Sequence, residues 1–123
     1  MYQKFNGPWI GDNENGTYKN PILLSDYSDP DVIRVGKDFI WLPVPLLIFR
    51  VFRFYSSRDL VNWEIISYAV DKLPFDDYDV PQHGKGVWAP SIRYHNGYVY
   101  VYFATPDEVY LLVQQMTLMV NGI

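Results

Sequence analysis

The chain has 123 residues and a mass of 14.5 kDa, which is room for one domain. Hydrophobic residues make up 49% and aromatic residues 18% of the sequence, so wholesale disorder is excluded. The net charge of -4 argues against nucleic acid as a partner, because a phosphate-binding surface needs clustered basic residues. Cysteine is absent, which excludes disulfides, thiol catalysis and Cys-ligated metals.

Residues 1–20 are polar and rich in turn residues, and they predict an N-terminal segment ahead of the folded domain. They contain no apolar stretch of the kind found in a signal peptide. The longest apolar run, Phe39–Phe49, is interrupted by prolines and is far shorter than the roughly 20 residues of a membrane-spanning helix. We therefore expect a soluble protein with no membrane partner, and the compartment stays open.

Short strands dominate the rest of the chain. The aromatic and β-branched runs predict strands at Val32–Val35, Glu64–Val70, Ser91–Tyr94 and Tyr98–Phe103. Gly36 opens one hairpin turn, and Asn96-Gly97 gives the strongest hairpin signal, between the last two of these strands. A long polar loop is expected over residues 71–86, and no helix is expected before residue 108. The pattern is typical of an all-β sandwich, barrel or propeller.

Asp29 stands at the start of the first of these strands, in the run SDPDVIRVGKD. Because the residue before a proline is restricted, we expect Asp29 to have an extended backbone and a fixed carboxylate. Such a carboxylate can serve as a general base. The commoner role of an Asp-Pro pair is an Asx turn before a strand, so both interpretations stay open.

Trp88 lies between small residues and a proline where a strand begins, and its ring face can stack on a sugar. Packing in a core is the commoner role of an isolated Trp. His83 belongs to a glycine-flanked loop that leads directly to Trp88. We therefore expect His83 to lie near the pocket in which Trp88 would stack on a sugar. The turn Arg58–Trp63, RDLVNW, is interpreted as structural, with Trp63 packing in a sheet core.

The stretches around Asp29, Arg58–Trp63 and Trp88, in this chain order and at this spacing, resemble glycoside hydrolase family 43, which contains β-xylosidases, α-arabinofuranosidases and arabinanases. The resemblance covers residues 20–39 and 56–108. It implies an all-β chain that forms the N-terminal portion, one to two blades, of a five-bladed β-propeller and is incomplete. On this basis residues 21–110 are a partial propeller domain, with residues 1–20 before it and an aberrant tail at 111–123.

The resemblance also implies a reaction. Family members hydrolyse O-glycosidic bonds with inversion, using an Asp base, an Asp that tunes pKa and orientation, and a Glu acid. By motif match Asp29 takes the place of the base, and Trp88 matches a Trp that lines the sugar pocket. The implied partner is a plant cell-wall oligosaccharide or polysaccharide of the xylan or arabinan type, and no cofactor is expected.

The other two carboxylates have no match in the chain. In the family they lie on later blades, and Asp107-Glu108 match the end of a family strand instead. We therefore expect this chain to be inactive by itself.

Residues 40–55 and 111–123 depart abruptly from the family pattern. Back-translation in another reading frame permits family-like sequences in both segments, which indicates two shifts of reading frame. On this interpretation a strand of the first blade has become an apolar run interrupted by proline, and sheet faces that other blades normally cover are exposed.

Two other functions remain open from the sequence. Trp88 and the tyrosines could bind sugar without catalysis, as in a carbohydrate-binding module, or the chain could be the inert product of a damaged gene. No metal site is expected. The acidic loop of Asp76, Asp77 and Asp79 lacks the glycine and distal Glu of an EF-hand. The pair His83 and His95 lacks a third ligand for zinc.

Overall fold

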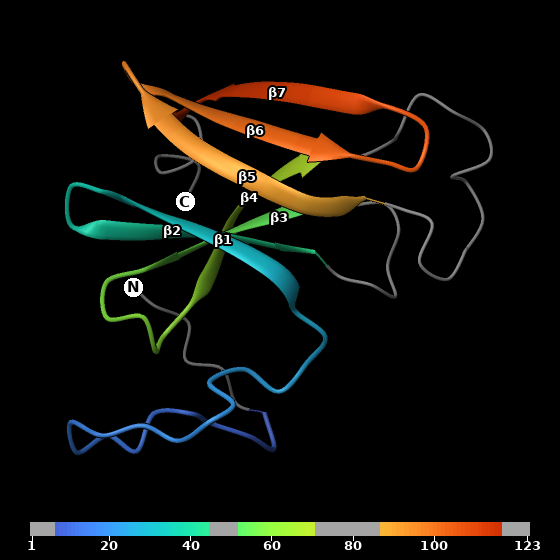
Figure 1. Ribbon diagram of the computed structural model, residues 1–123. Coiled ribbons are helices and arrows are strands. Elements are labelled where there is room, and N and C mark those ends of the chain that lie inside the picture. The colour runs from blue at the N-terminus through green and yellow to red at the C-terminus, as the bar shows by residue number, and fades with distance from the viewer. Residues whose placement is uncertain (1–6, 45–51, 71–86, 117–123) are drawn as a thin grey trace.

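The computed structural model describes residues 7–44, 52–70 and 87–116, and this part of the chain is all-β (Figure 1). Its strands are β1 (Ser28–Val35), β2 (Asp38–Val44), β3 (Phe52–Ser57), β4 (Glu64–Val70), β5 (Trp88–His95), β6 (Tyr98–Ala104) and β7 (Val109–Gln115). Strands β1 to β4 form one antiparallel sheet and β5 to β7 a second, each in chain order. The strands expected at 64–70, 91–94 and 98–103 are confirmed within β4, β5 and β6.

Tight turns join the first two strands of each sheet. Gly36 has a φ of 63° between β1 and β2, while Asn96 and Gly97 have φ values of 47° and 85° between β5 and β6. Left-handed conformations at both central residues suit the twist of a two-residue hairpin, which is why Asn-Gly favours it. The expected hairpin turns are therefore both present. No described residue before Met116 is helical.

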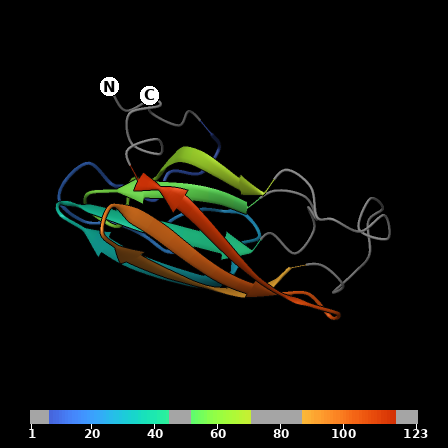
Figure 2. The same ribbon diagram turned by 90° about the horizontal axis from the view of Figure 1, so that it is seen from above.

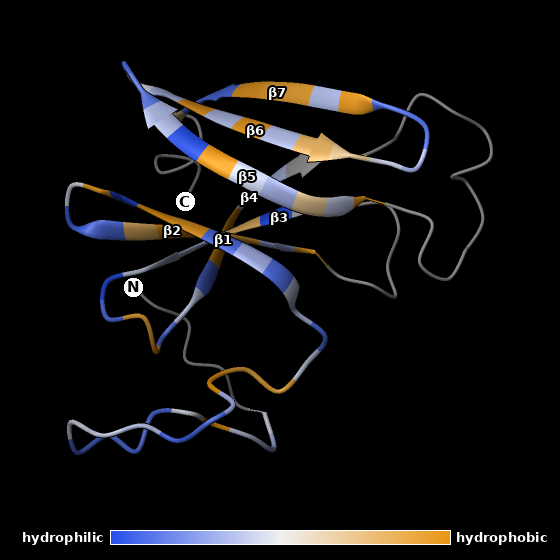
Figure 3. Ribbon diagram, in the orientation of Figure 1, coloured by the Kyte–Doolittle hydropathy of each residue, from blue (hydrophilic) through white to orange (hydrophobic). Residues whose placement is uncertain are grey.

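The core lies between the two sheets, which are stacked as layers (Figure 2). Alternate residues of β6 point inward, and Val99, Val101 and Phe103 are buried on that face. Figure 3 shows the corresponding alternation of apolar and more polar positions along β6. The buried apolar set is Ile40, Leu42, Val44, Phe54, Ile92, Val99, Val101, Phe103 and Met116.

Part of the segment 40–55 does form strands, contrary to the expected loss of a strand there. Residues 40–44 belong to β2 and residues 52–55 to β3, while residues 45–51 lie outside the described part. Pro43 is tolerated because it stands opposite the register shift in β1, where its missing N–H breaks no ladder bond. Arg53 fits less well: its Nε is buried and has no hydrogen-bond partner among the described residues. The altered reading frame itself stays a prediction.

Four aromatic rings from distant parts of the sequence pack together on the first sheet. Trp41 lies 5.0 Å from Tyr27, 5.1 Å from Tyr55 and 5.1 Å from Trp63, measured between ring centroids. Burial raises the pKa of Tyr55 to about 12, and its hydrogen bond with Tyr27 adds to the rise. Trp63 therefore packs against the sheet, but it is only partly buried and lies outside the buried core that the sequence predicted for it.

The face of the second sheet that points away from the core is apolar and exposed. On β7, Val109, Leu111 and Val113 are exposed, and Tyr98 and Tyr102 lie exposed on β6. An open apolar face is what the sequence predicts if other blades normally cover it. No helix among the described residues is long and apolar enough to cross a membrane.

Candidate active site

Asp29 is the second residue of β1, and its side chain is exposed. Its φ is 44°, in the left-handed region, so the expected extended backbone is wrong. The reason is a β-bulge: β1 advances from Ser28 to Asp31 while its partner strand moves only from Val44 to Leu42. The extra residue takes the chain out of the ladder, and Asp is one of the few residues that tolerate a left-handed conformation there.

The carboxylate of Asp29 is exposed at this bulge. The Ser28 hydroxyl donates a hydrogen bond of 3.0 Å to Asp29 Oδ2. Unusual backbone conformations that the surrounding structure imposes often occur at functional sites. The local geometry therefore suits a carboxylate that acts on something outside the sheet.

The second sheet repeats this arrangement. Trp88 is the first residue of β5. The register of β5 shifts in the same way between Trp88 and Ser91, because β5 has one more residue there than its partner strand β6. A proline follows within each bulge, Pro30 in β1 and Pro90 in β5. The side chain of Trp88 is 49% exposed, so much of its ring is accessible to a ligand.

Strands β1 and β5 contact each other and run in the same direction (Figures 1 and 2). Because they are parallel, the strand starts that carry Asp29 and Trp88 lie at the same end of the two sheets. His95 and its exposed ring lie at the opposite end of β5. That both Asp29 and Trp88 contact one ligand stays a prediction.

A hydrogen-bonded carboxylate joins the two strands. Asp31 Oδ2 accepts a hydrogen bond of 2.9 Å from the backbone N–H of Ile92 and one of 3.0 Å from Arg93 Nη1. These contacts link residues about sixty positions apart and hold β1 against the edge of the second sheet. Sequence reasoning missed Asp31 and Arg93, because neither belongs to a local motif that points to the other.

His83 lies outside the described residues, as do Asp76, Asp77 and Asp79, so their predicted places remain predictions. Asp107 and Glu108 lie in the turn between β6 and β7, where both backbone N–H groups donate to the Thr105 hydroxyl. Over the described ranges, no group of three or more His, Asp or Glu side chains is arranged to hold a metal ion.

The turn from Ser57 to Trp63 is built around Asp59. Asp59 Oδ1 accepts hydrogen bonds from the Ser57 hydroxyl and from the backbone N–H groups of Val61 and Asn62. Burial raises the pKa of Asp59, but the hydrogen bonds, chiefly from Asn62, outweigh it and lower the pKa to about 2. The structural interpretation of this motif agrees with these contacts.

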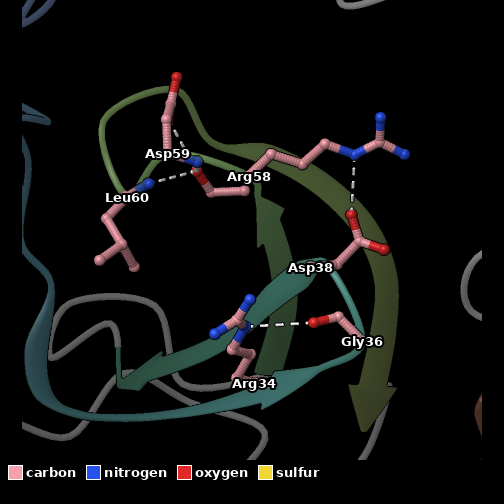
Figure 4. Close-up of polar contacts among 7 residues, drawn as sticks. Arg34, Gly36, Asp38, Arg58, Asp59 and Leu60 are labelled. Atoms are coloured by element: carbon pink, nitrogen blue, oxygen red, sulfur yellow. Dashed lines mark hydrogen bonds and ion pairs between the residues drawn. The ribbon is translucent and has the colours of Figure 1, made fainter.

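Figure 4 shows how the same turn is tied to the first hairpin. Arg58 Nε donates to Asp38 Oδ1 at 3.0 Å, and the Ser57 hydroxyl also accepts the N–H of Leu60. In the adjacent hairpin turn, Arg34 Nε donates to the carbonyl oxygen of Gly36 at 3.1 Å. These polar groups position the ends of β2, β3 and β4.

Comparison with known proteins identifies the family. The sequence model of glycosyl hydrolases family 43 matches residues 18–118. The chain belongs to this family. A putative β-xylosidase of Xylanibacter ruminicola is 42% identical over 106 residues, which are 80% of this chain and 18% of that protein. A non-reducing end α-L-arabinofuranosidase of Bacteroides ovatus is 34% identical over 88 residues, 69% of this chain and 16% of that protein.

Solved structures of family 43 proteins have the same fold over the matched part. A bifunctional protein of Bacteroides eggerthii matches with a TM-score of 0.67 at 28% identity, over 78% of this chain and 14% of the other. A xylan β-1,4-xylosidase of Bacillus halodurans matches with a TM-score of 0.64 at 28% identity, over 78% of this chain and 20% of the other. The expected all-β fold, with one to two blades of a β-propeller, is confirmed. The chain spans less than a fifth of the length of the two curated relatives.

Proposed function

We propose that Asp29 is the general base, and Trp88 a sugar-contacting residue, of a family 43 glycoside hydrolase that inverts the anomeric centre. The substrate class is xylan- or arabinan-type polysaccharide of the plant cell wall. The observation that carries the proposal is placement: an exposed carboxylate and an exposed indole begin two adjacent parallel strands, each at a bulge. The xylosidase and arabinofuranosidase names of the relatives support the substrate class.

In the inverting mechanism, Asp29 would take part in one proton transfer, as the base that accepts a proton from water. In an inverting glycosidase a carboxylate removes a proton from water as the water attacks the anomeric carbon. A second, protonated carboxyl group roughly 6.5–9.5 Å away donates its proton to the leaving oxygen. The Ser28 hydroxyl donates one hydrogen bond to Asp29 Oδ2 and leaves acceptor positions on both carboxylate oxygens for the water.

The 123 residues by themselves should not turn over substrate. No residue of this sequence matches the Glu acid or the modulating Asp of the family, and general acid catalysis typically contributes about 10²- to 10⁴-fold. His83 keeps its proposed place near the sugar pocket, on the strength of its position in the sequence before Trp88.

The test compares the 123-residue chain with a longer version. In the longer version, residues 40–55 and 111–123 carry the family-like sequences of the alternative frames, and the downstream coding region follows. We expect only the longer version to hydrolyse aryl-xylosides or aryl-arabinofuranosides. Asp29→Asn should abolish that turnover, whereas Asp26→Asn, three residues earlier and outside β1, should leave it intact.

Two results would contradict the proposal. Turnover by the short chain that disappears in Asp29→Asn would show that this chain needs no further carboxylates. Full turnover by the longer version carrying Asp29→Asn would remove the general-base assignment.

Binding without catalysis is the second candidate function, and the 49% exposure of Trp88 favours it. In that case the short chain should bind xylo- or arabino-oligosaccharides in calorimetric titrations. Trp88→Ala should weaken the binding while Asp29→Asn does not. If catalysis is the function, Asp29→Asn should leave binding to the longer version intact but remove turnover.

A further inference from the structure

A cavity of about 430 Å³ lies on the first sheet, away from the candidate active site. Its walls come from residues 9–12, 14 and 22–23 of the N-terminal segment, from residues 58–59 and 61–63 of the turn before β4, and from the first residue of β4, Glu64. None of these residues belongs to β1 or β5, which carry Asp29 and Trp88. The volume lies within the range of roughly 300–1,000 Å³ that is usual for small-molecule sites.

Direct contacts between the two walls hold the cavity in shape. Asn62 Nδ2 donates hydrogen bonds of 2.9 Å both to Asp12 Oδ2 and to Asp59 Oδ2, and so joins the N-terminal segment to the turn. The backbone of Gly11 approaches that of Ile22 so closely that an added Cβ would lie 2.6 Å from the Ile22 oxygen. The site is therefore largely preformed, which lowers the entropic cost of binding.

Two tryptophans line the cavity with ring surface. The only polar group of each indole is already used: Trp9 Nε1 donates to the Pro21 oxygen at 2.6 Å, and Trp63 Nε1 donates to the Leu60 oxygen at 3.1 Å. Lys19 Nζ lies over the Trp9 ring, 4.6 Å from its centroid, so what the two indoles can offer a ligand is the remaining apolar ring surface. Ring packing against Trp41 holds Trp63 in place.

Carboxylates supply the polar part of the lining. Asp12, Glu14, Asp59 and Glu64 all line the cavity, whereas Arg58 is its only basic residue among those described. Nε of Arg58 is engaged by Asp38, outside the cavity. The acidic excess disfavours anionic ligands, and carboxylate oxygens accept hydrogen bonds from hydroxyl groups.

We propose that this cavity is a second carbohydrate-binding site, which takes a neutral oligosaccharide with C–H faces on Trp9 and Trp63 and hydroxyl edges toward the carboxylates. A pyranose or furanose ring has both kinds of surface, whereas an aliphatic ligand would displace water from the carboxylates without replacing the hydrogen bonds of that water. The proposal shares its ligand class with the proposed function but none of its residues. The two can therefore fail separately.

The test uses the full chain labelled with 5-fluorotryptophan, whose four indoles give separate ¹⁹F resonances. Single Trp→Phe variants assign the resonances. Xylotriose and arabinotriose are titrated as neutral ligands, glucuronic acid as an anionic one, and calcium chloride and free lysine as cations. At least one neutral sugar should shift the Trp9 and Trp63 resonances saturably, and glucuronic acid should not. Trp88 reports on the candidate active site in the same spectra.

A matched pair of variants checks the location. Trp9→Ala should raise the Kd read from Trp63 about tenfold, or about 1.4 kcal/mol. Tyr18→Ala removes an exposed aromatic ring of the same N-terminal segment that does not line the cavity, and it should leave this Kd unchanged. An unshifted Trp41 resonance shows that the sheet is still folded in each variant.

Three outcomes would overturn the proposal. In the first, both neutral sugars leave Trp9 and Trp63 unmoved, even where Trp88 responds. In the second, only calcium or lysine shifts them, which would make the cavity a cation site. In the third, Trp9→Ala and Tyr18→Ala weaken binding equally. Saturable shifts of Trp9 and Trp63 with Trp88 unmoved would support the second site and count against the sugar-contacting role of Trp88.

Discussion

Replacing Asp31 by alanine should destabilise the chain more than its exposed position suggests. The substitution removes the acceptor of the Ile92 N–H, which lies in a partly buried contact between the sheets. Leaving such a group without a partner costs about 1–3 kcal/mol. The ion pair with Arg93 adds little, because the side chains of Arg93 and Asp31 are 68% and 31% exposed, and such pairs contribute at most about 1 kcal/mol. We expect a loss of about 2 kcal/mol in the free energy of unfolding.

Urea unfolding at equilibrium measures this loss. With a slope of about 2 kcal/mol per molar urea, the midpoint for Asp31→Ala should fall by about 1 M. Arg93→Ala is the matched control, because it removes the ion pair and leaves Asp31 to accept the Ile92 N–H, and its midpoint should fall by less than half as much. Equal shifts for the two variants would refute the reasoning, since they would show that the backbone hydrogen bond contributes nothing measurable.

Three further predictions concern pH and packing. The pKa of Asp59 is about 2 against an ordinary 3.8, so the stability it contributes should be complete above about pH 4 and fall as the pH drops toward 2. Asp59→Asn should remove this acid dependence from urea unfolding. The pKa of Tyr55 is about 12 against 10.0, so its contribution should persist below pH 10 and fall as the pH rises toward 12. Tyr55→Phe should flatten that alkaline limb, and a limb of unchanged slope would contradict the assignment. Gly11→Ala places a Cβ 2.6 Å from the Ile22 oxygen and should lower the melting temperature, at a cost of about 1–3 kcal/mol.

Local patterns in the sequence were enough to predict most of the strands. The alternation in Tyr98–Ala104 and the turn at Asn96-Gly97 determine both the strand and its partner, because a two-residue turn fixes the register of a hairpin. The strand around Pro43 was missed for a physical reason. Proline breaks a strand only where its N–H is needed, and here it faces a bulge that the sequence does not reveal.

The same bulge explains why the conformation of Asp29 was predicted wrongly. The preference of a residue before proline is local and weak, whereas the extra residue in β1 is imposed by pairing with β2. Contacts between segments far apart in sequence were also out of reach. Nothing near Asp31 points to Ile92, and nothing near Trp9 points to Trp63, although both tryptophans line the same cavity.

The bond from Asp31 to Ile92 links the stability of the two sheets to the position of the candidate site. Asp31 stands two residues after Asp29, and Ile92 stands four residues after Trp88. The contact therefore fixes the two strands relative to each other within four residues of the candidate site. The bulges lie between this contact and the strand starts, and they are where each backbone leaves its ladder. A change at Asp31 should therefore alter the proposed sugar contact at Trp88 as well as stability, whereas a change in β4 or β7 should alter stability alone.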